Sequence, residues 1–197
     1  WANLAWGYLG AGDLVQAKRA LDKAIQINPA ATIELYRLGS LHRLRGEYAD
    51  AEQAFLRVLE VKPGEIAAHY EVGTVYLLMK RDADAKARFR TFRAAVETLA
   101  EANPKEAGHR LSLAMAALRL GASARADALM RKSMAMDPSQ HFGLAAYWSV
   151  RGDSEAAIDE LELAIKNGFR NYIWMTIHTD FDNLRGRPRF QALLDRV

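Results

Sequence analysis

"LYRLGSLHRLRGEYADAEQAFLRVLEVKP", residues 35–63, decides the fold of this chain. Apolar residues at helical spacing fill its first half, Gly46 interrupts them, and a second apolar stripe ends at a Lys-Pro pair. Gly46 and Pro63 each have a counterpart 34 residues earlier, at Gly12 and Pro29. A fixed period of this length indicates a repeat architecture, in which each unit is one supersecondary element.

Residue types recur at the same spacing. The first unit carries Trp1, Leu4, Ala5, Tyr8, Gly12, Ala17, Leu21, Ala24 and Pro29. The second unit fills the same positions with Leu35, Leu38, Gly39, His42, Gly46, Ala51, Phe55, Val58 and Pro63. This pattern resembles the tetratricopeptide repeat, and more degenerate units extend the resemblance over about residues 1–168. The resemblance implies a solenoid of stacked helix pairs.

Small residues at the expected helix crossings give this resemblance a physical basis. Two helices pack at about 8–10 Å only where facing side chains are small, and Gly39 and Ala51 supply such positions. One pair cannot bury its own apolar face, so stacked pairs share a continuous core. We therefore predict an all-α fold, a right-handed superhelical solenoid of about five antiparallel helix pairs with a C-terminal helical cap. The predicted helices span residues 2–10, 14–27, 31–45, 48–61, 65–79, 82–102, 104–120, 123–136, 139–150 and 154–167.

Prolines and glycines mark the predicted domain organisation. The solenoid is expected over residues 1–168, with units at about 1–29, 30–63, 64–103, 104–138 and 139–168, followed by a capping segment at 169–197. The third unit departs from the pattern, because Lys80 takes the place of the turn glycine and the next proline comes seven residues late. Since the chain opens on Trp1, we expect an upstream domain, or any signal peptide, to lie outside this sequence.

Composition excludes several classes of function. With 27 basic and 24 acidic residues, the net charge of +3 is too balanced to favour nucleic acid as a partner. The chain has no cysteine, which excludes disulfides, thiolate metal sites and cysteine nucleophiles. No apolar run approaches the roughly 20 residues that a membrane span needs. Compartment is not readable from these features, although we slightly favour the cytoplasm.

The titratable residues do not form a recognised catalytic pattern. The five histidines lack metal-ligand spacing. His178 lies near Asp180 and Asp182, but no nucleophilic serine or glycine-rich elbow accompanies them. We expect Asp180 to be the N-cap of a short helix that Gly186 ends. The sequence therefore predicts no catalytic residue, no cofactor, no metal site and no enzymatic activity.

The resemblance implies that the first helix of each pair lines a concave groove, where variable inward-pointing residues contact a protein or peptide partner. Mapping those positions by the repeat phase gives Trp6, Tyr36, Arg37, Ser40, Arg43, Tyr70, Thr74, Met115 and Arg119. Aromatic side chains would bury area against the partner, and arginines would donate to its carboxylates or backbone oxygens. The alternative is that some of these residues pack between helices. Self-association and a second interface on the basic stretch from Lys80 to Arg93 stay open.

The last residues break the repeat pattern and are rich in aromatic residues and arginine. A solenoid needs an amphipathic end because its final layer is otherwise exposed, and Phe190, Leu193 and Leu194 stand at helical spacing after Pro188. We interpret this tail as a lid, in preference to a separate binding site. It also resembles the ends of bacterial tetratricopeptide proteins, which often join the repeats to a signalling domain.

These observations predict an interaction scaffold that binds a protein or peptide in its groove. The resemblance of the tail implies the regulatory part of a larger bacterial signalling protein. Two alternatives stay open: a structural subunit or adaptor in an envelope or secretion assembly, and the non-catalytic region of an enzyme whose catalytic domain lies elsewhere.

Overall fold

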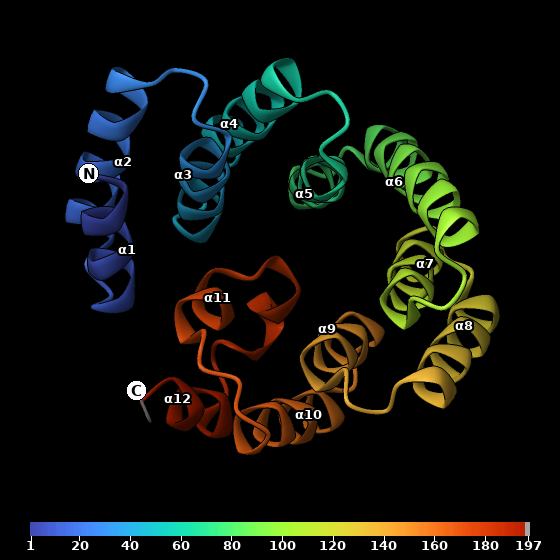
Figure 1. The fold of residues 1–197 in the computed structure, drawn as a ribbon. Helices are drawn as coiled ribbons and strands as arrows, with labels where there is room; N and C mark the ends of the chain where they lie inside the picture. Colours follow the sequence, from blue (N-terminus) through green and yellow to red (C-terminus); the bar gives the residue numbers. More distant parts are fainter. Residues whose placement is uncertain (196–197) are drawn as a thin grey trace. The chain divides into compact units, whose positions relative to one another are not determined.

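The computed structural model describes residues 1–195, which fold into helices without a β-strand in that range. The chain forms two compact units, one from Trp1 to Arg88 and the other from Phe89 onward. The boundary falls inside one helix, α6 (Asp82–Ala102). Each unit is described by itself below, and Figure 1 gives the order and the labels of the helices. The sequence-derived repeat boundaries are a different kind of division and stay predictions.

The first unit consists of antiparallel helix pairs joined by short turns. Its helices are α1 (Ala2–Gly10), α2 (Leu14–Ile27), α3 (Thr32–Leu44), α4 (Tyr48–Val61), α5 (Ile66–Leu78) and the beginning of α6. The partners within a pair, α1 with α2 and α3 with α4, share the most extensive contacts, while α2 packs on α3 and α4 on α5. Each pair therefore shares its apolar surface with the next, as the stacking argument requires.

A close helix crossing inside the second pair confirms the role expected of its small residues. A Cβ atom added to Gly39 would lie 2.8 Å from the ring of Phe55, which is fully buried. Ala51 on α4 is also fully buried. The Phe55 ring is held from the side by Tyr36, whose ring centroid lies 5.3 Å away in an edge-on geometry. Only a glycine leaves room for the aromatic ring at this crossing.

The turns within the helix pairs use left-handed backbone conformations. Gly12 and Gly46 have φ values of 73° and 74°, which glycine adopts without a Cβ penalty. Lys80 occupies the equivalent turn between α5 and α6 with a φ of 61°. Its amide donates to the carbonyl of Leu77 at 3.0 Å, and the next amide, of Arg81, donates to Tyr76 at 2.8 Å. The turn thus keeps its geometry although lysine replaces glycine.

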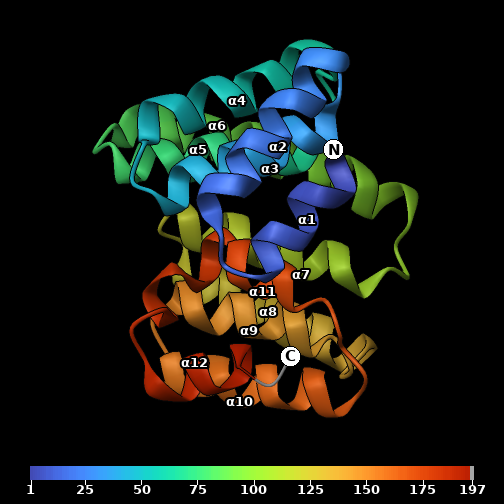
Figure 2. The same cartoon turned by 90° about the vertical axis from the view of Figure 1, so that its left-hand side faces the viewer.

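The second unit holds two further pairs and the tail. It contains the remainder of α6, then α7 (Ala107–Arg119), α8 (Ser123–Met136), α9 (His141–Arg151), α10 (Ser154–Lys166), α11 (Tyr172–Ile177), the 3-10 helix η1 (Thr179–Leu184) and α12 (Pro188–Leu194). Helix α7 pairs with α8 and α9 with α10, while α7 also packs on α9. The tail packs on the last pair: η1 lies against α9, and α12 lies beside α10 (Figure 2).

Large apolar side chains of the tail complete the core of the second unit. Phe181, Leu184 and Phe190 are fully buried, and Leu193 is nearly so. The ring centroids of Phe181 and Phe190 lie 6.1 Å apart, which joins η1 to α12. The predicted fold class, antiparallel helix pairs with a C-terminal helical cap, is therefore confirmed.

Surface ion pairs of Arg189 connect α12 to α10. Its guanidinium lies 2.6 Å from Glu155, 2.8 Å from Asp159 and 3.1 Å from Glu162, all on α10. These three carboxylates raise the pKa of Arg189 above its ordinary value through their hydrogen bonds. Several charges that share one guanidinium form a network, which stabilises a surface contact more than an isolated ion pair does.

Predicted and observed helix bounds agree closely. The predictions for α1, α2, α4, α6 and α8 match the observed helices at both ends, and the remaining predictions differ by one to three residues at an end. The largest difference is at α7, which begins at Ala107 instead of residue 104. Glu106 is its N-cap, and the carboxylate of Glu106 accepts from the amide of Gly108 at 3.4 Å. The residues directly after Pro104 thus form a turn.

Candidate functional site

In the first unit, Trp6 of α1 and Arg37 of α3 lie together. The guanidinium carbon of Arg37 lies 4.3 Å from the centroid of the Trp6 ring, a cation–π distance. One carboxylate is near, with Glu34 Oε1 at 3.7 Å from Arg37. Burial lowers the pKa of Arg37, and Glu34 opposes that effect. The stacked ring fixes the plane of a guanidinium whose five N–H groups are suited to carboxylates.

Tyr36, the residue before Arg37 on α3, contacts a different helix. Its hydroxyl donates to Glu71 Oε1 of α5 at 2.8 Å. Adjacent side chains of α3 therefore connect to the first helices on either side, Arg37 toward α1 and Tyr36 toward α5. Three of the predicted groove residues, Trp6, Tyr36 and Arg37, thus belong to one continuous set of contacts between first helices.

Four other predicted groove residues of the first unit are buried. The hydroxyl of Ser40 donates to the carbonyl of Tyr36 at 3.1 Å, and that of Thr74 donates to Tyr70 at the same distance. Such bonds to the preceding helical turn occupy the hydroxyl hydrogens within their own helices. Arg43 and Tyr70 have exposed fractions of 3% and 8%.

In the second unit, the two predicted groove residues lie on α7. Met115 is buried, and Arg119 forms an ion pair with Asp180 of the tail. The Arg119 nitrogen lies 2.7 Å from Asp180 Oδ1, and the Asp180 side chain is only 4% exposed. The guanidinium carbon of Arg119 also lies 5.8 Å from the ring centroid of Phe89. Arg119 thus binds a carboxylate, as expected of a groove arginine, and this carboxylate belongs to the same chain.

Helix α9 holds the same tail segment through polar contacts. The hydroxyl of Ser149 contacts both the carbonyl oxygen of Asp180 and Asn183 Oδ1, the latter at 2.5 Å. The Asn183 amide donates in return to the Ser149 carbonyl at 3.0 Å. Aromatic packing adds to these bonds, because Phe142 of α9 meets Phe181 edge-on with centroids 5.4 Å apart. Residues 178–184 are thus bound by α7 and α9, which are first helices of their pairs.

The structure corrects the expected cap of the short tail helix. His178 is the N-cap of η1, and its Nδ1 accepts from the amide of Asp180 at 3.3 Å. The prediction that Asp180 is the cap was wrong, because the Asp180 carboxylate pairs with Arg119. The helix is a 3-10 helix that ends at Leu184, two residues before Gly186.

Comparisons with known proteins agree with the repeat pattern. Residues 35–65 match the family model of the tetratricopeptide repeat. A thermophilic tetratricopeptide-repeat protein of Thermus thermophilus, TTC0263, aligns over 98% of this chain and 96% of its own, with 17% identity and a TM-score of 0.58. This protein has the tetratricopeptide-repeat fold. That fold generally serves as a non-catalytic scaffold for contacts between proteins.

Two further solved structures share the same tetratricopeptide-repeat fold. PilW, a type IV pilus biogenesis factor, aligns over 98% of this chain and 88% of its own, with 16% identity and a TM-score of 0.55. PilF of Pseudomonas aeruginosa aligns over 97% and 86%, with 18% identity and a TM-score of 0.54. No curated protein matches the sequence. Within residues 1–195, none of the helices combines the length and apolar character that crossing a bilayer requires.

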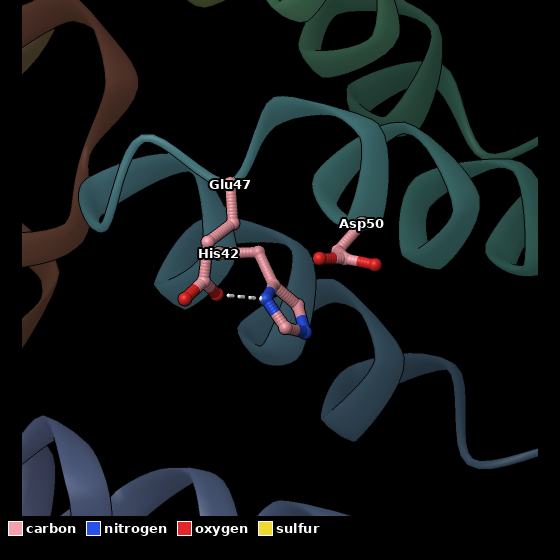
Figure 3. A group of neighbouring side chains, drawn as sticks. All are labelled: His42, Glu47 and Asp50. Carbon is pink, nitrogen blue, oxygen red and sulfur yellow. Dashed lines mark hydrogen bonds and ion pairs between the residues drawn. The ribbon is translucent and has the colours of Figure 1, made fainter.

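One group of side chains in the tetratricopeptide fold has the composition of a metal site (Figure 3). It joins His42 at the end of α3, Glu47 at the N-cap of α4 and Asp50 in the first turn of α4, with ligand atoms within 4.8 Å of one another. His42 Nδ1 lies 2.6 Å from Glu47 Oε2, and Arg45 Nε lies 2.9 Å from Glu47 Oε1. The hydrogen bond with His42 is the main cause of the lowered pKa of Glu47.

These contacts of Glu47 favour a structural role for the group. A divalent ion would have to replace the hydrogen bond of His42 and compete with the charge of Arg45. The prediction of no metal site was based on the spacing of histidines and cysteines alone. That spacing does not reveal a group made of one histidine and two carboxylates from the next turn.

A pocket of about 610 Å³ lies in the second unit beside Trp148. Its walls carry charges of both signs that already pair. Arg151 Nε lies 3.2 Å from Asp127, and Arg187 lies 3.4 Å from Glu155. The pocket therefore offers no excess charge of one sign to a ligand.

Proposed function

We propose that this tetratricopeptide-repeat protein is a non-catalytic scaffold that binds a protein or peptide segment along the first helices of its pairs. The predicted residues Trp6, Tyr36 and Arg37 support this proposal because they come from neighbouring first helices and contact one another or the next helix. The placement in a bacterial signalling protein rests on the resemblance of the tail alone and stays a prediction.

The stacking of Arg37 on Trp6 is the observation that carries the proposal. An aromatic ring beneath a guanidinium restricts its motion, so less conformational entropy is lost when a carboxylate binds. Trp and Arg are also the residues most enriched among those that dominate binding energy at interfaces. The pair is therefore suited to an acidic side chain, and the half-buried Trp6 ring could also contact an apolar neighbour in the partner.

A displayed library of random peptides, selected on the intact chain, tests the proposal. We expect selected peptides to share an acidic residue next to an apolar one. Trp6→Ala and Arg37→Ala should each weaken their binding by about tenfold or more, as expected for interface hot spots. Arg19→Ala, on the exposed surface of the second helix α2, is the control and should leave binding unchanged.

Equal affinity of the selected peptides for all three variants and for the unchanged chain would exclude Trp6 and Arg37 from the binding site. Failure of the library to yield any peptide specific for the chain would count against the scaffold proposal as a whole.

A further inference from the structure

The tail contacts the helix pairs of the second unit in two different ways. Helix α12 packs on α10, the second helix of the last pair, and extends the stack as a cap. The preceding segment, residues 178–184, lies instead against the first helices α7 and α9. Solenoids of this kind use concave surfaces for binding, and the family resemblance implies that first helices line that surface. The cap and the segment therefore have separate positions, although they are adjacent in sequence.

The contacts of residues 178–184 are those of a bound peptide. Arg119 pairs with the carboxylate of Asp180, and Ser149 contacts the backbone carbonyl of the same residue. The next side chain, Phe181, is fully buried against Phe142. A paired charge, a hydrogen-bonded backbone oxygen and a buried aromatic side chain are elements by which a scaffold recognises a segment.

Bonds within the tail also stabilise the conformation of residues 178–184. Arg185 Nε lies 2.9 Å from Asp182, and the guanidinium of Arg185 donates to the carbonyl oxygens of Thr176 and His178, the latter at 3.2 Å. The bond to His178 spans η1, and the bond to Thr176 joins η1 to α11. Bonds within a segment reduce the entropy that it loses when it binds.

We propose that the α7/α9 face is a recognition surface for segments that carry an aspartate followed by an aromatic residue. Residues 178–184 occupy this face as an intramolecular ligand, which a partner segment of the same chemistry displaces. The inference rests on the proposed scaffold function and assigns a ligand class to the second unit. The two remain separable, because this inference depends on Arg119 and the proposed function is tested at Trp6 and Arg37.

Competition between the tail and a partner has a quantitative consequence. A tethered segment acts at an effective concentration of the order of millimolar, so it shields its face from a free peptide of equal intrinsic affinity. Weakening the tethered copy raises the fraction of molecules that can bind, and the apparent affinity for a free copy rises by the same factor.

The test uses a fluorescent peptide with the sequence of residues 172–187 and the full chain carrying Asp180→Ala and Phe181→Ala. We expect this variant to bind the peptide at least about tenfold more tightly than the unchanged chain does. A peptide with the same two alanines should not bind. Adding Arg119→Ala to the chain should reduce binding about tenfold or more, whereas Arg125→Ala, on the exposed surface of α8, should not.

A second measurement uses the unchanged chain, in case the double variant does not fold. Addition of the unlabelled peptide in large excess should increase amide hydrogen exchange in residues 178–184 while exchange in α7 and α9 stays slow. The proposal is overturned if exchange of the segment stays constant at every peptide concentration. It is equally overturned if the folded double variant binds both peptides alike, or binds neither.

Discussion

The two units present their first helices differently. In the first unit, α1, α3 and α5 are connected directly to one another by the Arg37–Trp6 stack and the Tyr36–Glu71 hydrogen bond. In the second unit, Arg119 of α7 and Ser149 of α9 instead bind a segment from the tail of that unit. In the first unit the first helices thus contact one another, whereas in the second unit they contact residues that follow the repeats.

Removal of the tail should have the largest effect, because it should destabilise the second unit more than the first. Removing residues 172–197 would expose the surfaces of α9 and α10 that Phe181, Leu184 and Phe190 cover. At about 1.5–3 kcal/mol for each large apolar side chain, we expect the second unit to lose more than about 5 kcal/mol or to aggregate. Urea unfolding followed by hydrogen exchange in each unit measures this. A truncated chain that stays monomeric and equally stable would show that the tail is not a structural cap.

Breaking the ion pair between Arg119 and Asp180 should have the next largest effect on stability. Arg119→Ala removes the partner at 2.7 Å from a nearly buried carboxylate, Asp180, and should lower the free energy of unfolding by about 3 kcal/mol. Arg125→Ala breaks only an exposed pair, with Glu97 at 3.7 Å, and should change it by less than about 0.5 kcal/mol. Thermal unfolding of both variants measures the difference. Equal stability of the two would mean that residues 178–184 are weakly held.

A glycine in each of two first helices tests the packing of the first unit. Gly39→Ala would place a Cβ 2.8 Å from the buried Phe55 ring and should cost about 1–3 kcal/mol through overpacking. Gly7→Ala in α1 meets no atom within 4 Å and should instead stabilise the chain by about 0.5–1 kcal/mol. Urea unfolding compares the signs of the two changes. A stabilising Gly39→Ala would contradict the close crossing of α3 and α4.

The turn at Lys80 gives a smaller effect. Its φ of 61° is disfavoured for a residue with a Cβ, so Lys80→Gly should stabilise the first unit by about 0.5–1 kcal/mol. Gly46→Ala, at a φ of 74° in the equivalent turn of the preceding pair, should change stability in the opposite direction. Differential scanning calorimetry of both variants checks the pair of signs.

The smallest expected effect is a dependence on pH at the turn between α3 and α4. The pKa of Glu47 is lowered mainly by its hydrogen bond with His42. A carboxylate with a lowered folded-state pKa adds stability above the unfolded pKa of roughly 4.3, and this stability is lost as the pH falls through the folded-state pKa. Glu47→Gln should therefore lose less stability below pH 4 than the unchanged chain. Urea unfolding at several pH values would show equal losses if the hydrogen bond were unimportant.

Features that recur every 34 residues could be predicted from the sequence. Gly46 ends a first helix with a positive φ, and Lys80 takes the same conformation at the equivalent position. Because such a position occurs in several repeats, each repeat gives separate evidence for its role. The helix bounds followed for the same reason, apart from the turn after Pro104.

Features that occur once could not be predicted in this way. The partner of Arg119 is Asp180, 61 residues away, in a tail without a repeat phase. Local rules favoured Asp180 as a helix cap. Its carboxylate instead pairs with Arg119, and the side chain of His178 caps the helix. Ser149 and Asn183 were missed for the same reason, because nothing in either neighbourhood indicates that the two meet.

Helix α6 begins in one unit and ends in the other, since the boundary after Arg88 lies within its 21 residues. Helix formation is cooperative, so melting one end of a continuous helix raises the free energy of the turns that remain. Loss of structure in either unit should therefore fray α6 into its neighbour. We therefore expect unfolding of one unit to lower the stability of the other through the continuous backbone of α6.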